Sequence, residues 1–193
     1  MSESTEQRIY QRLAEAQTVF GSLGKEFAQT VASAAEITSA GLKAGGAVYF
    51  VGNGGSAADA QHWAAELVGR YLHDHTPLNA HALTVNSSVM TALGNDFPAD
   101  EIFSRQVQAH LRAGDILVAI STSGNSENIL RAIATAANLG ASVIGVTGKG
   151  GGKMAEICDL TFIAPSDDTP RIQEAHLFFG HCFCELVEQA FLD

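Results

Sequence analysis

Charge is scarce in this sequence of 193 residues, and positive charge is the scarcest. Charged residues make up 17% of the chain, against a usual share of about 25% in globular proteins. The 11 Lys and Arg residues are outnumbered by 21 Asp and Glu residues, which gives a net charge of −10, and the basic residues are scattered along the chain. Binding to a nucleic-acid backbone relies on a cluster of basic side chains. The sequence therefore argues against nucleic acid as a partner, and it predicts that an anionic ligand is held by local dipoles.

Cysteines and long apolar runs are also lacking. The three cysteines, Cys158, Cys182 and Cys184, form neither an even framework nor a CxxC pair, so we expect reduced thiols. No apolar run approaches the roughly 18 residues that a membrane-spanning helix requires, and the polar N-terminus has no apolar signal core. We expect a cytoplasmic protein without a membrane partner.

Apolar residues, in contrast, make up 46% of the chain, which is enough for a full core. Five short apolar runs, bounded by turn residues, are typical of strands buried on both faces, at 47–51, 81–85, 116–120, 142–147 and 160–164. Helical segments lie between and after them, at 56–71, 99–111, 126–139, 153–157 and 170–191. This alternation predicts an α/β fold, a three-layer α-β-α sandwich with a mainly parallel five-stranded sheet.

Two further helical patterns, at 5–21 and 27–42, precede the first strand and predict an N-terminal helical hairpin. We interpret residues 1–193 as one domain, in which 1–45 pack against a neighbour or cap the sheet and 46–193 form the α/β core. The low charge of the chain favours surface buried between subunits, and therefore an oligomer. Ligands of such sheets bind beyond the carboxyl ends of the strands.

Two of the loops at those ends could hold a phosphate. Asn53, Gly54 and Gly55 follow the first strand and open a helix, where glycine allows close backbone approach and the helix N-terminus offers free N–H groups. A tight strand-to-helix turn explains this loop equally simply. The second loop is richer in hydroxyl groups, with Ser121, Thr122, Ser123 and Ser126. A helix N-cap accounts for Ser126 but not for the three residues before it, so we predict a phosphomonoester site.

Acid–base and metal candidates lie on two helices. His62 and Glu66 are four residues apart and share a helix face, as two metal ligands or a base and its partner would, or as an ordinary exposed pair would. Gln173 and His181 lie on the last helix, about 12 Å apart along it at 1.5 Å per residue. Reaching one metal from both requires converging side chains or two subunits. His176 on the same helix is the weaker candidate, because a buried histidine explains it.

Five segments of the chain together carry a resemblance to a known family: GNGGSAADAQHWAAELVGRY, GNDFPADEIFSRQV, ISTSGNSENIL, TGKGGGKMAE and TPRIQEAHLFFGH. They resemble the sugar-isomerase (SIS) domain family, most closely its heptose-phosphate isomerase branch, over nearly the whole chain. The resemblance implies a cytoplasmic homotetramer with active sites at subunit interfaces. It also implies isomerisation of sedoheptulose 7-phosphate to D-glycero-D-manno-heptose 7-phosphate through an enediol, the first step toward the heptose of lipopolysaccharide core.

The resemblance assigns roles to residues of this sequence. Glu66 and His181 would be the acid–base pair. The substrate would be lined by Asn53, Gly54, Gly55, Glu66, Asn95, Asp96, Ser121, Thr122, Ser123, Ser126 and Gln173. One zinc ion per subunit would be held by His62, Glu66, Gln173 and His181. The sequence departs from some relatives at Asn86, where they carry Asp, and at Pro170, where they carry a charged residue.

Two other functions are compatible with this fold. One is a catalytically silent tetramer that binds a replication initiator protein, and the other is a regulatory domain that senses a sugar phosphate. Because a binding protein has no need of an acid–base pair, the presence of Glu66 and His181 favours the enzyme.

Overall fold

The structure is a computed structural model and describes residues 4–192. Its sheet has five strands, all parallel, in the order β2-β1-β3-β4-β5. The strands are β1 (Val48–Gly52), β2 (Ala80–Ala82), β3 (Ile116–Ser121), β4 (Ser142–Thr147) and β5 (Leu160–Ile163). In the register, Ser121 at the end of β3 pairs with Thr147 at the end of β4. The carboxyl ends therefore lie together at one edge, as the sequence predicts.

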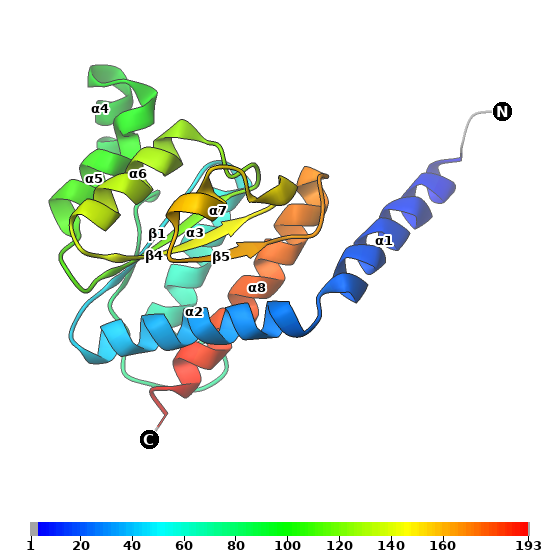
Figure 1. The fold of residues 1–193 in the computed structure, drawn as a ribbon, viewed down its shortest axis with the longest axis horizontal. Helices are drawn as coiled ribbons and strands as arrows, with labels where there is room; N and C mark the ends of the chain where they lie inside the picture. The colour runs from blue at the N-terminus through cyan, green and yellow to red at the C-terminus, as the bar shows by residue number, and fades with distance from the viewer. Residues whose placement is uncertain (1–3, 193) are drawn as a thin grey trace.

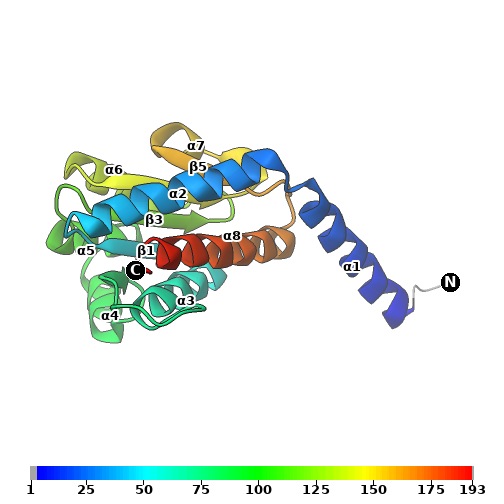
Figure 2. The same cartoon turned by 90° about the horizontal axis from the view of Figure 1, so that it is seen from below.

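Helices cover both faces of the sheet (Figures 1 and 2). On one face lie α2 (Lys25–Lys43), α3 (Gly55–Val68) and α8 (Thr169–Gln189), and on the other lie α5 (Ile102–His110) and α6 (Glu127–Asn138). Alternate residues of the central strand β3 face the two layers of helices. Val118 belongs to the core beneath the first set, whereas Leu117 and Ala119 belong to the core beneath the second. The predicted three-layer sandwich is confirmed.

Shorter elements complete the chain. The helix α4 (Ser87–Asp96) is followed by a 3-10 turn (Ala99–Glu101), and a second 3-10 turn (Lys149–Gly151) precedes α7 (Met154–Ile157). Asn86 begins α4 by accepting a hydrogen bond from the backbone N–H of Val89 at 3.1 Å. No residue of α4 is fully buried, and Met90 packs only partly buried against the core. The predicted strand at 81–85 is shorter than expected, because the chain leaves the sheet after Ala82.

The N-terminal helix α1 (Thr5–Ser22) extends away from the body instead of folding back on α2 (Figures 1 and 2). It begins with a capping box between Ser4 and Gln7 and contacts the body mainly through α8. Its apolar residues Ile9 and Tyr10 are 62% and 69% exposed. The predicted N-terminal helices are therefore present, but they do not close into a hairpin. Of the helices between residues 4 and 192, none combines the length and the hydropathy needed to span a bilayer.

Candidate active site

The loop between β1 and α3 lies against the start of α6. Gly54 has a φ of +55°, a conformation that favours glycine, and α3 begins at the next residue. The side-chain amides of Asn53 and Asn128 exchange two hydrogen bonds, of 3.0 and 2.9 Å. The two predicted phosphate loops are thereby joined at the sheet edge. Asn128 was not among the predicted site residues.

The loop between β3 and α6 holds its hydroxyl groups in an arrangement that leaves the helix end uncapped. Ser126 stands at the N-cap position of α6, but its side chain makes no capping hydrogen bond. Its Oγ lies instead 3.1 Å from Oγ of Ser121, which is buried at the end of β3. Thr122 and Ser123 are half-buried between them. Hydroxyl groups and a helix N-terminus together form an environment suited to a phosphate.

This loop is held from the side of β4. The Oδ1 atom of Asn125 accepts a hydrogen bond from the backbone N–H of Lys153, and its Nδ2 donates to the carbonyl of Ser123. Gly124 has a φ of +62°, and a Cβ there would collide with the carbonyl of Gly151. The loop can approach the glycine segment after β4 this closely only with glycine at 124.

Close packing of α3 on α8 gathers the acid–base candidates. Trp63 is completely buried, and a Cβ on Gly180 would overlap its indole ring. Beside this contact, Nε2 of His62 lies 3.0 Å from Nε2 of His181, although the two residues are 119 apart in sequence. The Oε1 atom of Glu66 lies 3.5 Å from Nδ1 of His62. The result is a row of three groups in the order Glu66, His62, His181.

The row has a defined polarity. A carboxylate beside Nδ1 of His62 favours the tautomer with a proton on Nδ1, which leaves Nε2 to accept a hydrogen bond from His181. One turn before His62, burial raises the pKa of Asp59 to about 6, although the nearby His62 opposes the rise. The side chains of His62 and Glu66 are 40% and 22% exposed, so the row is open to solvent.

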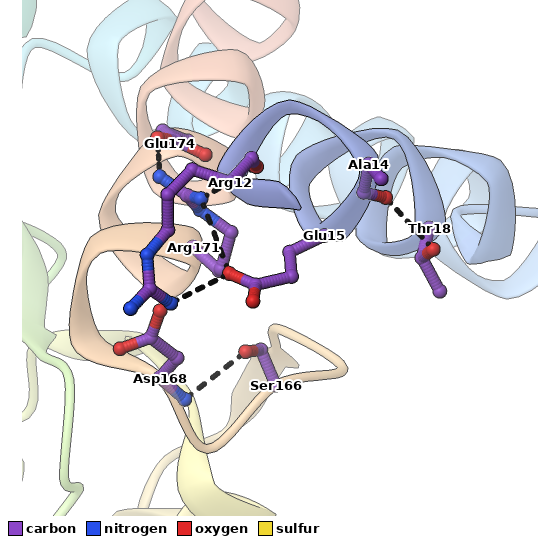
Figure 3. Close-up of polar contacts among 8 residues, drawn as sticks. All are labelled: Arg12, Ala14, Glu15, Thr18, Ser166, Asp168, Arg171 and Glu174. Atoms are coloured by element: carbon purple, nitrogen blue, oxygen red, sulfur yellow. Dashed lines mark hydrogen bonds and ion pairs between the residues drawn. The ribbon is translucent and has the colours of Figure 1, made fainter. Parts of the chain in front are cut away.

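A cluster of charged groups fixes the start of α8 (Figure 3). The guanidinium of Arg171 donates to the backbone carbonyl of Arg12 at 2.8 Å and pairs with Glu174, and Glu15 lies 3.7 Å from it. This cluster attaches α1 to α8 two residues before Gln173. The side-chain amide of Gln173 lies where a Cβ on Gly55 would be, so it reaches the loop between β1 and α3.

Other predicted residues lie elsewhere. Asn95 and Asp96 bond to each other at the end of α4, and no hydrogen bond among residues 4–192 connects them to the two loops. His176 is buried, and its Nε2 lies 3.0 Å from the carbonyl of Thr147. Burial lowers its pKa to about 4, against the effect of that hydrogen bond. His176 is therefore a neutral core residue, in line with the simpler interpretation of the sequence.

Two of the four predicted zinc ligands present donor atoms to one point. The Nε2 atoms of His62 and His181 face each other, and imidazole nitrogen is a preferred ligand of zinc. Glu66 lies at the other nitrogen of His62, and Gln173 lies beside Gly55. In the part of the chain that the structure describes, no three His, Cys, Asp or Glu side chains form a group that could hold a metal. The donor chemistry thus fits zinc, and Glu66 and Gln173 would have to move to complete the site.

Comparisons with known proteins identify the family of the chain. A family model described as the SIS domain matches residues 12–148. A phosphoheptose isomerase of Rhodospirillum rubrum is 61% identical over 84% of this chain and 87% of its own length. One of Aquifex aeolicus is 50% identical over 94% of both. The solved structure of a phosphoheptose isomerase from Neisseria gonorrhoeae matches 96% of this chain and 100% of its own, with a TM-score of 0.91 and 40% identity. The chain therefore belongs to the SIS domain family and, within it, to the phosphoheptose isomerases.

Proposed function

We propose that the chain isomerises sedoheptulose 7-phosphate to D-glycero-D-manno-heptose 7-phosphate. The observation that carries the proposal is the row of Glu66, His62 and His181 beside two loops suited to a phosphate. The names of the relatives point to a phosphorylated heptose, and the resemblance of the sequence supplies the particular ketose. The residues of this chain supply a base, an acid and an anion site.

The spacing of the two parts favours a substrate with its phosphate remote from its carbonyl. Gly55 stands at the start of α3 and His62 lies seven residues further along, about 10 Å at 1.5 Å per residue. A sugar phosphate anchored at the loops must extend along α3 for its other end to reach His62. An open-chain ketose phosphorylated at its last carbon meets this requirement.

The reaction moves one proton between adjacent carbons. In our proposal, the Glu66 carboxylate removes a proton from C1 of the ketose, and the C1–H electron pair forms the C1–C2 double bond of a cis-enediol. The Nε2–H of His181 turns from His62 to the bound sugar, donates its proton to the carbonyl oxygen at C2, and Nε2 later accepts the proton from the hydroxyl at C1. Glu66 then returns its proton to C2, which yields the aldose. His62 stands between the two groups and orients the ring of His181.

The loop hydroxyls and the amides at the start of α6 hold the phosphate, and their contribution is positioning. Zinc is a separate part of the proposal: His62 and His181 would hold it, with Glu66 and Gln173 completing the site, and when bound it would polarise the sugar carbonyl. Zinc bound directly to Glu66 and His181 would compete with their acid–base roles. A calorimetric titration with zinc alone tests this part, with His62→Ala as the variant that should lose binding.

We further propose that the chain acts as a cytoplasmic homotetramer with active sites at subunit interfaces. Support comes from α1, which projects from the body with Ile9, Tyr10 and Leu13 exposed, and from exposed Phe178 on α8. Sedimentation should give a mass of four chains, and Leu13→Glu should reduce it. A monomer at micromolar concentration would contradict this part.

The test of the function is incubation of the purified protein with sedoheptulose 7-phosphate, with and without a chelator, while aldose formation is followed by NMR. Product is expected, and loss of product on chelation with return on adding zinc would make the metal functional. No product under any condition would contradict the proposal and favour the initiator-binding regulator, which a pull-down with initiator protein would then test. If the proposal holds, the product is the first precursor of the heptose of lipopolysaccharide core.

A further inference from the structure

The segment that follows α3 is held by a buried carboxylate on α8. Glu188 is 1% exposed and accepts hydrogen bonds from three consecutive backbone N–H groups, those of Tyr71, Leu72 and His73, at 2.7 to 3.1 Å. Burial alone would raise the pKa of Glu188, but these hydrogen bonds, with a contribution from His75, hold it below its usual value. The carboxylate is therefore charged at neutral pH and has a fixed set of donors.

A fully buried imidazole lies beside the carboxylate of Glu188. The Nδ1 atom of His75 lies 2.8 Å from the carbonyl of Thr76, so Nδ1 carries the proton that makes this hydrogen bond. Its Nε2 lies 3.5 Å from Oε2 of Glu188. The segment 71–75 thus contacts one carboxylate from both of its ends.

The first residue of the anchored segment touches the proposed active site. The ring of Tyr71 stacks on the imidazole of His181, with centroids 5.7 Å apart and planes at 27°. The same imidazole also contacts His62 through its Nε2 atom. His181 is therefore held between Tyr71 and His62, and Glu188, two turns further along α8, fixes where Tyr71 lies.

We propose that Tyr71 and Glu188 are positioning residues for His181: Tyr71 sets the orientation of the imidazole by stacking, and Glu188 acts through Tyr71 by anchoring its backbone. This inference rests on the proposed function only for its kinetic consequence. It adds two residues that carry no role in the reaction by themselves. The ring of Tyr71 matters here and its hydroxyl does not, so phenylalanine should replace it.

The kinetic test is a double-mutant cycle on the full-length protein with sedoheptulose 7-phosphate. Tyr71→Ala should lower kcat about tenfold or more with KM within about twofold, because a displaced catalytic group costs rate and not binding. Tyr71→Phe should restore kcat. Glu188→Gln should lower kcat in the same way, and the double variant Tyr71→Ala/Glu188→Gln should be no slower than Tyr71→Ala. Glu185→Gln, which removes an exposed carboxylate one turn away, is the matched control and should keep wild-type kcat.

The second readout does not depend on activity. The ring-proton resonances of His181, assigned with His181→Gln, should shift in Tyr71→Ala through loss of the neighbouring ring. They should shift in Glu188→Gln as well, although that variant retains the tyrosine. Fluorescence of Trp63, the one tryptophan, checks the fold, and Glu188→Asp serves if Glu188→Gln does not fold.

The outcomes separate the two proposals. Additive losses of kcat in the double variant, or His181 resonances unmoved in Tyr71→Ala, would overturn the positioning role. A wild-type protein without isomerase activity would overturn the proposed function. The His181 resonances alone would then show whether Tyr71 and Glu188 position its imidazole.

Discussion

The loop between β3 and α6 and the contact between α3 and α8 both present polar groups to a substrate, but different forces hold them. The loop is held mostly by hydrogen bonds between near neighbours in sequence, in which Ser126 turns to Ser121 five residues away and Asn125 bonds to Ser123, with one further hydrogen bond from Lys153 after β4. The contact joins residues 119 apart and depends on the buried surface between Trp63 and Gly180. Damage to the loop should therefore affect binding, whereas damage to the contact should affect the chemical step and the stability of the fold together.

The largest effect is expected at the row itself. Glu66→Gln and His181→Ala should each lower kcat about 10²- to 10⁴-fold, the usual contribution of a general base or acid. The assay is aldose formation followed by NMR, with circular dichroism and sedimentation to show that fold and assembly persist. Near-normal kcat in either variant would remove that residue from the mechanism.

Loss of loop hydroxyls should act on binding instead. Ser123→Ala and Ser126→Ala should each raise KM about tenfold with kcat little changed, because a hydrogen bond to a charged group contributes about 1.5–3 kcal/mol. Thr135→Ala on the same helix α6 is the matched control. If kcat falls while KM is unchanged, these hydroxyls do not simply bind the phosphate.

The contact between the helices can be loosened without replacing Glu66, His62 or His181. Gly180→Ala should place a methyl group against the Trp63 indole, lowering the free energy of unfolding by about 1–3 kcal/mol and kcat together. Gly21→Ala is the control, since its Cβ would meet no atom within 4 Å in α1 and should be harmless or slightly stabilising. Denaturant unfolding and the kinetic assay measure both effects. A stable, fully active Gly180→Ala protein would show that the tight contact is not needed.

A last effect concerns pH. His176 has a folded pKa of about 4 against an ordinary value of 6.5, so between these values the unfolded chain binds more protons. The free energy of unfolding should fall as pH is lowered through this window. At pH 5, His176 should account for a loss of roughly 2 kcal/mol relative to neutral pH. His176→Gln should flatten the dependence relative to wild type, and His73→Gln, at an exposed position, should not. Equal slopes in wild type and His176→Gln would contradict the neutral buried imidazole.

The same contrast explains what the sequence could predict. The sheet was predictable because β1, β3 and β4 are buried on both faces and carry nearly continuous apolar runs. The two loops were predictable because glycine and hydroxyl residues directly follow strands. The helix α4 was not, since none of its residues is fully buried and Met90 packs only partly buried against the core. The outward direction of α1 depends on how α1 meets α8 at Arg171.

The row of three groups was predictable only in part. The spacing of His62 and Glu66 places them on one helix face, but nothing local brings His181 to His62. The roles of Tyr71 and Asn128 arise from contacts across the fold, so composition and spacing carry no signal for them. The predicted role of Asn95 and Asp96 at the substrate stays a prediction: they lie at the end of α4, and no hydrogen bond among residues 4–192 joins them to either loop.

Proton transfer through Glu66 is the central claim, and isomerisation in D₂O tests it most directly. Because the side chain of Glu66 is 22% exposed, its transferred proton should exchange with solvent, and deuterium should appear at C2 of the aldose. In Glu66→Gln, both product formation and exchange at C1 of the ketose should be lost. Product that retains all its protium, formed at an unchanged rate by Glu66→Gln, would contradict the account.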